Sequence, residues 1–450
     1  MCHSGIALVI QIGNAAAAAA TEAEAAFADL AAAHCSTCAV ALQPWSDGSL
    51  HRGSGLFLTA AASQGDVVLR VPTSLCLAVD YAAGLRLPPG AWPRLQRGVQ
   101  KDAALPWDIL LALALLDSLS GGGDAFWERY SNAVLPQPLD LTLPLCLPPR
   151  LLPQLQHAAI AAGAAAQQER LAGLFPGLGG SMSEDGPTWL QWGFGCVRSR
   201  AFRLADEHFA FVPLLDVANH AADPSCDFRL NAGEGCVELV AVKDLQPGQE
   251  ATISYTGPAG MTNQRLMAQY GFVPGGNLAD RLQFAALDGA GAAGIAEAGA
   301  AGRGSAGDAA MADDGAQAVL MSLDRMQACM GSDQRMASAM GGRDPFAYAA
   351  LKSLPFAADE AAAAPLGRQL SLAEHLHAEL EAEAAAWPTS LAQDGAVLQG
   401  WQEQGLGGGG GGLDARMVAV VEYRLRRKAL VATCRQLLLD FMEGPPPGAA

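Results

Sequence analysis

The chain has 450 residues, 51% of them hydrophobic, so it is long enough for two or three domains with their own cores and is not disordered as a whole. Its net charge is −17, from 45 acidic and 28 basic residues, which repels phosphate backbones and gives no overall charge pattern for binding DNA or RNA. Ten cysteines spread over so long a chain are typical of free thiols in a reducing compartment.

Residues 1–44 are rich in alanine, and we expect them to be either a frayed helix or a disordered leader. No Lys or Arg precedes Arg52, so the leader lacks the positive start of a secretory signal. It also carries acidic residues, whereas transit peptides are rich in arginine and poor in acids. The sequence therefore leaves cytoplasm and chloroplast both open as the compartment.

Two short segments have features of a zinc site and of a membrane-spanning helix, respectively, and we expect neither. Cys35 and Cys38, beside His34, have the spacing of half a zinc site, but no second pair supplies the other ligands, so we expect no bound metal. The apolar run at 105–116 is interrupted by Pro106 and Asp108 and falls short of the roughly 20 residues that cross a bilayer. We expect no membrane span.

The elements that follow predict a β domain interrupted by helices. Residues 51–57 and 65–72 have the pattern of two strands joined by a turn. From about residue 88 to 191 the apolar residues recur with helical spacing, which predicts a helical insertion. Strand patterns return at three segments, 209–215, 236–242 and 251–255, with a turn at 246–249 between the last two. We take residues 45–285 as one split domain.

The remaining third of the chain predicts a helical domain. A short helix is expected at 263–270, then a Gly/Ala-rich linker at 286–315 and helices over 316–441, interrupted by the glycine-rich stretch 405–412. The last helix has one apolar stripe and an opposite basic face; the stripe is Val418, Val421, Leu425, Ala429 and Ala432, and the basic face is Arg424, Arg427 and Lys428. We expect residues 442–450 to be a disordered tail.

Three local patterns carry the chemical information, and they occur in the order Gly53-Ser54-Gly55-Leu56, then Arg198-Ser199-Arg200-Ala201-Phe202 with Asp216-Val217-Ala218-Asn219-His220, then Ser254-Tyr255 with Tyr270-Gly271-Phe272. Together they resemble the SET family of protein methyltransferases, and more narrowly its plant ribulose-bisphosphate-carboxylase large-subunit methyltransferase branch. The resemblance covers about residues 45–440. It implies an α+β fold: a SET β core with a pseudo-knot, a helical insertion, and a mainly α-helical C-terminal domain that binds the substrate.

The resemblance also implies S-adenosyl-L-methionine as the cofactor and assigns its site. The cofactor-binding residues would be Gly53, Ser54, Gly55, Ser199, Arg200, Asp216, Asn219, His220, Tyr255 and Phe272. Glycines let a backbone approach a ligand closely, and an arginine suits the cofactor carboxylate. Each residue also has an ordinary structural interpretation: a tight turn, a core histidine, a surface arginine, or an aspartate that caps a strand end. Arg52 stands where related enzymes often carry an acid.

Tyr255 is the residue that the resemblance makes catalytic, because a phenol beside the transferred methyl group can steer the amine lone pair. Tyr255, Tyr270 and Phe272 would line the lysine channel, although a single aromatic residue more often belongs to a core. A lysine ammonium, with an ordinary pKa of about 10.4, must lose a proton before it attacks, and desolvation favours that loss.

We therefore predict a protein-lysine N-methyltransferase that acts as a monomer on a non-histone protein, with the carboxylase large subunit or another plastid or cytosolic protein as the candidate substrate. No zinc-binding cysteine clusters flank the domain as they do in many histone-directed relatives. Two alternatives stay open: a protein-histidine methyltransferase, and a non-catalytic SET-fold module that binds peptides. We expect no nucleic acid partner.

Overall fold

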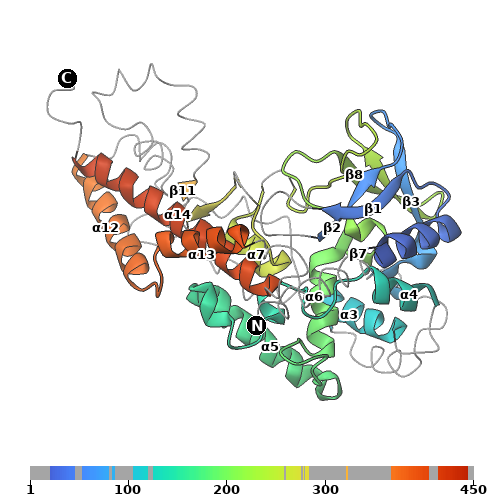
Figure 1. The fold of residues 1–450 in the computed structure, drawn as a ribbon, viewed down its shortest axis with the longest axis horizontal. Helices are drawn as coiled ribbons and strands as arrows, with labels where there is room; N and C mark the ends of the chain where they lie inside the picture. Colours follow the sequence, from blue (N-terminus) through green and yellow to red (C-terminus); the bar gives the residue numbers. More distant parts are fainter. Residues whose placement is uncertain are drawn as a thin grey trace, which may run out of the picture.

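The protein was analysed as a computed structural model, which describes residues 21–45, 53–80, 84–86, 105–119, 125–257, 260–274, 277, 279–282, 321–322, 366–404 and 414–443. Figure 1 shows strands β1, β2, β3, β7 and β8 gathered at one side, the long C-terminal helices with β11 beside them at the other, and α5 and α7 between them. The predicted α+β class is confirmed. The predicted linker at 286–315, the glycine-rich stretch 405–412 and most of the predicted tail lie outside the described residues.

The strands are β1 (Val40–Trp45), β2 (Gly53–Leu58), β3 (Val67–Pro72), β4 (Leu77–Asp80), β5 (Gly84–Arg86), β6 (Ala201–Ala205), β7 (His208–Phe211), β8 (Cys226–Asn231), β9 (Cys236–Ala241), β10 (Arg281–Leu282) and β11 (Met321–Ser322). The helices are α3 (Trp107–Ser118), α4 (Ala125–Ala133), α5 (Ala158–Leu174), α6 (Trp189–Arg200), α7 (Asn263–Tyr270), α12 (Leu366–Ala385), α13 (Leu391–Glu403) and α14 (Ala415–Glu443). Single 3₁₀ turns are η1 (Thr73–Leu75), η2 (Pro144–Cys146), η3 (Leu152–Leu155), η4 (Pro176–Leu178) and η5 (Leu215–Val217).

The described strands form small antiparallel sheets, in the orders β1-β2, β3-β9-β8, β5-β4-β7-β6 and β10-β11. The two strands predicted at 51–57 and 65–72 exist as β2 and β3, but they do not pair with each other. β2 pairs with β1, and β3 pairs with β9. The chain does turn between them, and at that turn Gly65 donates from its backbone to Ala241, which directs β3 along β9. The turn was thus predictable, and the partner was not.

For the alanine-rich leader at residues 1–44, the expectation of disorder is wrong from residue 21 onward, whereas the expectation of a helix is met at residues 21–34. Residues 21–34 form a helix that buries Ala26, Phe27, Leu30 and Ala31, and the last three of these join the main core. Alanine has the strongest intrinsic helix preference, and burial of one apolar face supplies the stability that an isolated helix lacks. Residues 1–20 lie outside the described residues.

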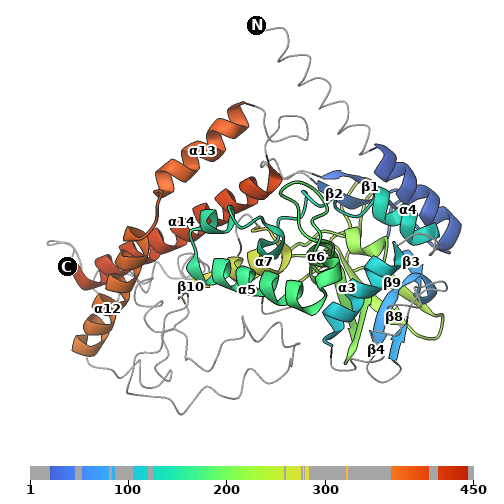
Figure 2. The same cartoon turned by 90° about the horizontal axis from the view of Figure 1, so that it is seen from below.

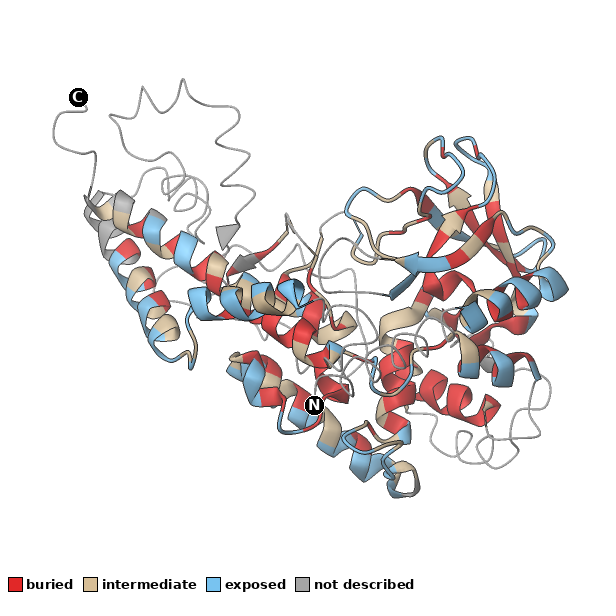
Figure 3. Cartoon of the chain, in the orientation of Figure 1, coloured by how far each residue is buried: buried red, intermediate tan, exposed pale blue. Residues whose placement is uncertain are grey.

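The predicted helical insertion is present as α3, α4 and α5, with 3₁₀ turns between them. Every residue of α3 after Trp107 is buried (Figure 3), because the helix is apolar around most of its circumference and packs against α6. α4 contributes Trp127 and Tyr130, both fully buried, to the same core. Helices α3 and α4 of the insertion therefore belong to the same core as the strands and are not an appendage.

The C-terminal helices α12, α13 and α14 form the predicted helical lobe, which extends away from the strands in Figure 2. The basic face expected on α14 does not lie in solvent, because Arg424 and Lys428 are buried. Both pair with the buried Asp394 of α13, at 2.8 and 2.6 Å. Lys428 also donates to Gln156, just after η3, at 2.7 Å. Arg424 and Lys428 can be buried because a carboxylate on another helix pairs with both of them.

α14 also packs directly against α7. Met267 and Val273 belong to a buried apolar cluster together with Ala419, Val420 and Tyr423 of α14. The lobe therefore supports the segment that runs from α7 to Val273. In the described part of the chain, no helix combines the length and the apolar character that a bilayer crossing needs.

Candidate active site

Two chain segments that are distant in sequence run side by side at the centre of the site. His220 and Ile253 form a parallel β-bridge, in which Ile253 N donates to Asn219 O at 2.9 Å and Ala221 N donates to Ile253 O at 3.0 Å. On the other side, Ala251 N donates to Leu56 O of β2 at 2.7 Å. The strand predicted at 251–255 is instead an extended segment with a different short partner on each side. These are the segments where the resemblance expects a pseudo-knot.

The β2 backbone meets Asn219 at this crossing. Asn219 Nδ2 donates to Ser54 O at 3.1 Å and to Glu250 Oε1 at 2.8 Å. A Cβ atom on Gly55 would lie 2.5 Å from Glu250 Oε1 and 2.8 Å from Asn219 Nδ2, whereas one on Gly53 would meet nothing within 4 Å. Of the two predicted glycines, Gly55 is therefore the one whose missing side chain permits a close approach.

Arg200, at the end of α6, is held by a buried carboxylate. Its Nη1 lies 3.0 Å from Asp216 Oδ2 and 3.3 Å from the Asp216 carbonyl oxygen. Burial raises the pKa of Asp216, while the guanidinium of Arg200 acts in the opposite direction. The side chain of Arg200 keeps 21% of its surface exposed, so it can still meet a ligand. Asp216, which the resemblance assigns to the cofactor site, is the ion-pair partner of Arg200 in this structure.

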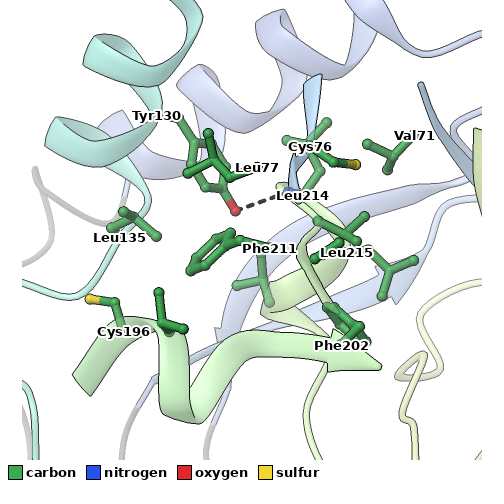
Figure 4. Packing of buried hydrophobic residues seen from close by; sticks show 14 of the residues in the cluster. Val71, Cys76, Leu77, Tyr130, Leu135, Cys196, Phe202, Phe211, Leu214 and Leu215 are labelled. Atoms are coloured by element: carbon green, nitrogen blue, oxygen red, sulfur yellow. Dashed lines mark hydrogen bonds between the residues drawn. The ribbon is translucent and has the colours of Figure 1, made fainter. Parts of the chain in front are cut away.

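Tyr130 of α4 completes this buried network. Its hydroxyl donates to Asp216 Oδ1 and accepts from Leu214 N at 2.9 Å, the bond drawn in Figure 4. Leu214 has a φ of 69°, which is costly for a leucine, and its N–H is the group that Tyr130 satisfies. The sequence pattern places Tyr130 among ordinary apolar helix positions. Its partner, 86 residues away, is what gives it this role.

Ser199, another residue that the resemblance assigns to the cofactor site, has its hydroxyl bonded within α6. Its hydroxyl donates to Gly195 O at 2.9 Å and to Cys196 O at 3.3 Å, so it bonds back onto its own helix. Serine does this readily near a helix end, where it competes for carbonyl groups of the preceding turn. Arg200, the next residue, turns toward Asp216 instead.

Four predicted site residues come together as one aromatic cluster: His220, Tyr255, Tyr270 and Phe272. Ring centroids lie 5.3 Å apart for His220 and Tyr255, 4.9 Å for Tyr255 and Tyr270, and 6.2 Å for both His220–Phe272 and Tyr270–Phe272. Tyr255 OH donates to Ala218 O at 2.7 Å, and Tyr270 OH donates to Tyr255 O at 3.2 Å. Three separate chain segments thus contribute to one wall.

The protonation states in this cluster follow from burial. Burial raises the pKa of Tyr255, so its hydroxyl keeps its proton at neutral pH. Burial lowers the pKa of His220, which favours the neutral ring. His220 Nδ1 accepts a hydrogen bond from Tyr255 N at 3.2 Å, as a neutral ring with its proton on Nε2 can.

Gly271 directs Phe272 into the cluster. α7 begins after Thr262, whose side chain caps it, and ends at Gly271, which has a φ of 81° and donates to the carbonyls of Leu266 and Met267. The bounds of this helix, 263–270, are those predicted. A Cβ on Gly271 would lie 2.6 Å from Leu143 N, so the turn also packs tightly against the insertion.

Glu250 was not predicted as a site residue, yet it lies between Gly55 and Asn219. Burial raises its pKa, and hydrogen bonds from Asn219 and Trp45 act in the opposite direction. The turn that precedes it, with Gly248 at a φ of 81°, is the one expected at 246–249. Nothing local in the sequence marks this acid, because its partners come from two other segments.

Comparison with known proteins agrees with this arrangement. Residues 53–256 match the family model of the SET domain. A structure of Rubisco LSMT bound to AdoMet is 17% identical, with a TM-score of 0.57 over 94% of this chain and 92% of that one. The SET domain of LSMT bound to lysine and AdoHcy gives 17% identity and a TM-score of 0.55, over 93% and 91%.

Another Rubisco LSMT structure, bound to sinefungin and monomethyllysine, is 18% identical, with a TM-score of 0.54 over 93% of this chain and 91% of that one. No curated protein matches the sequence. The chain carries a SET domain, and it shares the fold of these structures from the β core through the helical lobe, as the resemblance implied.

Proposed function

We propose that this SET-domain chain is an S-adenosylmethionine-dependent protein-lysine N-methyltransferase that acts on a non-histone protein. The observation that carries the proposal is the aromatic cluster around Tyr255, because it adjoins the crossing at Asn219 and thus joins a channel wall to polar groups that suit the cofactor. The related structures that hold AdoMet, AdoHcy, lysine or monomethyllysine support the same chemistry.

The residues present fit the cofactor by their chemistry. Its carboxylate needs a cation, and Arg200 is a partly exposed guanidinium that Asp216 holds from one side. Its ammonium group needs acceptors, and the side-chain carbonyl of Asn219 is one. Its aromatic base needs apolar surfaces to pack against, and the ring faces of His220 and Phe272 provide them. When bound, the cofactor supplies an electrophilic methyl group.

Tyr255 would orient the attacking amine. Its hydroxyl proton is engaged by Ala218 O, so the phenol oxygen presents lone pairs to an amine N–H rather than its own proton. Fixing one amine N–H in this way directs the nitrogen lone pair. The surrounding rings exclude water, which favours the neutral form of a lysine amine over the ammonium.

Calorimetry with S-adenosylmethionine and S-adenosylhomocysteine, followed by transfer of a labelled methyl group to protein extract, tests the proposal. The wild type should bind both ligands, and Asn219→Ala should bind them at least about tenfold more weakly because a hydrogen-bond partner of a charged group is lost. Tyr255→Phe should bind normally and lose about 100-fold in transfer rate.

Acid hydrolysis of the labelled product separates the alternatives. Methyl-lysine supports the proposal, and methyl-histidine would replace it with a histidine methyltransferase. A wild type that binds neither ligand would make the chain a non-catalytic SET-fold module.

A further inference from the structure

The carboxamide of Asn219 lies between two groups that can only accept hydrogen bonds. Its Nδ2 is 3.1 Å from the carbonyl oxygen of Ser54 and 2.8 Å from Glu250 Oε1. The chemistry therefore fixes which end of the amide faces β2, since a reversed amide would place its own oxygen against two others. Both Nδ2 protons are used in this way.

Glu250 is itself held in place from several directions. Its carboxylate accepts from Trp45 as well as from Asn219, and its backbone oxygen accepts from Ser225 Oγ at 2.7 Å. Its backbone pairs with Phe57 of β2. Within the described ranges no Lys or Arg forms an ion pair with it. The acid is thus fixed, half-buried and set between two strand-like segments.

The orientation of Asn219 leaves Oδ1 as the group that points away from β2. No donor from the described part of the chain reaches that oxygen. Resting on the proposed function, we propose that Glu250 is a positioning residue for the cofactor: it fixes the Asn219 carboxamide so that Oδ1 accepts from the α-ammonium group of S-adenosylmethionine. The fixed negative charge behind the amide also favours a cationic ligand.

The variant Glu250→Gln tests this directly, because it keeps the shape of the side chain and exchanges one oxygen for an NH₂ donor. One remaining oxygen then has to serve two donors, Trp45 and Asn219, so the Asn219 amide loses its fixed orientation. Affinity for S-adenosylhomocysteine, which carries the ammonium group, should fall about tenfold. Affinity for 5′-methylthioadenosine, which lacks the whole amino-acid part, should stay within about twofold.

Glu234→Gln is the matched control, since Glu234 is an exposed acid that pairs with Arg70 rather than with Asn219. It should leave both affinities unchanged. Transfer assays on Glu250→Gln should show a raised KM for S-adenosylmethionine with kcat within about twofold, because Glu250 does not touch the reacting atoms.

Equal weakening of both ligands in Glu250→Gln would overturn the inference and assign Glu250 a general structural role. Unchanged binding of S-adenosylhomocysteine would overturn it as well. Neither result touches the proposed function, which fails only if the wild type binds no cofactor or transfers no methyl group to lysine.

Discussion

At the scale of single residues, Gly55 defines how closely β2 approaches the site. An added methyl group there would lie 2.5 Å from Glu250 Oε1, inside any real contact distance. Gly55→Ala should therefore displace Glu250 and Asn219, at a cost of about 1–3 kcal/mol, and weaken cofactor binding about tenfold or more. Gly53→Ala, with open space around it, should bind as the wild type does. Calorimetry on the two variants would show equal affinities if the close approach had no functional meaning.

Short motifs predicted the residues that the structure brings into one aromatic cluster, but they did not predict the residues that hold them. Tyr255, Tyr270 and Phe272 stand within recognisable local patterns. Tyr130 and Glu250 do not, because their roles depend on partners 86 and 31 residues away. A role that arises from a distant contact leaves no local signal in a sequence. Ser199 is the converse case, since its neighbours fit the motif while its hydroxyl bonds to its own helix.

At the scale of elements, the left-handed turn after α7 aims Phe272. Gly271 and Gly65 both have positive φ angles, of 81° and 95°, but only Gly271 packs against backbone. Either change to alanine should cost about 1–2 kcal/mol in conformational strain. Gly271→Ala should also push the turn away from Leu143 and lower methyl transfer by more than tenfold, while Gly65→Ala keeps full activity. Thermal unfolding and kcat/KM of both variants provide the check, and equal activities would contradict it.

Elements with their own end signals were predicted at their observed positions. Helix α7 has a capping Thr262 before it and Gly271 after it, and its predicted bounds are the observed ones. Strands β2 and β3 lie in segments with strand and turn signals, yet those signals say nothing about which partner each strand takes. The sequence left helix and disorder both open at 21–34, because an alanine-rich composition is compatible with either until a core covers one face of the helix.

At the scale of the whole molecule, the helical lobe joins the insertion through buried charge. Asp394→Ala would leave Arg424 and Lys428 buried without their carboxylate, so we expect a loss of about 3–5 kcal/mol in the free energy of unfolding. Asp206→Ala removes an ion pair with Arg203 that solvent reaches, and it should have no measurable effect. Urea unfolding of both variants measures the difference. Similar midpoints would mean that the buried cations find other partners.

The buried ion pairs of Asp394 with Arg424 and Lys428 also show what a charge pattern does not predict. Charged residues on a helix are counted as solvent-facing, since lysine and arginine are seldom fully buried. Lys428 is buried because Asp394, Thr389 and Gln156 all reach it from other parts of the chain. The helical character of this region was predictable from its spacing, whereas the side of α14 that faces inward was not.

The hydrogen bond from Asn219 to Ser54 has a consequence for the order of events during synthesis, since it joins residues 165 positions apart. At about 5–20 residues per second, Ser54 leaves the ribosome roughly 8–33 s before Asn219 does. Residues 251–255, which lie between β2 and Asn219, follow later still, and Phe272 follows them. Until residues 251–255 are made, the β1–β2 sheet has an edge whose backbone N–H and C=O groups are unpaired. A nascent chain that stalls before residues 251–255 therefore exposes such an edge and has no cofactor site to stabilise it.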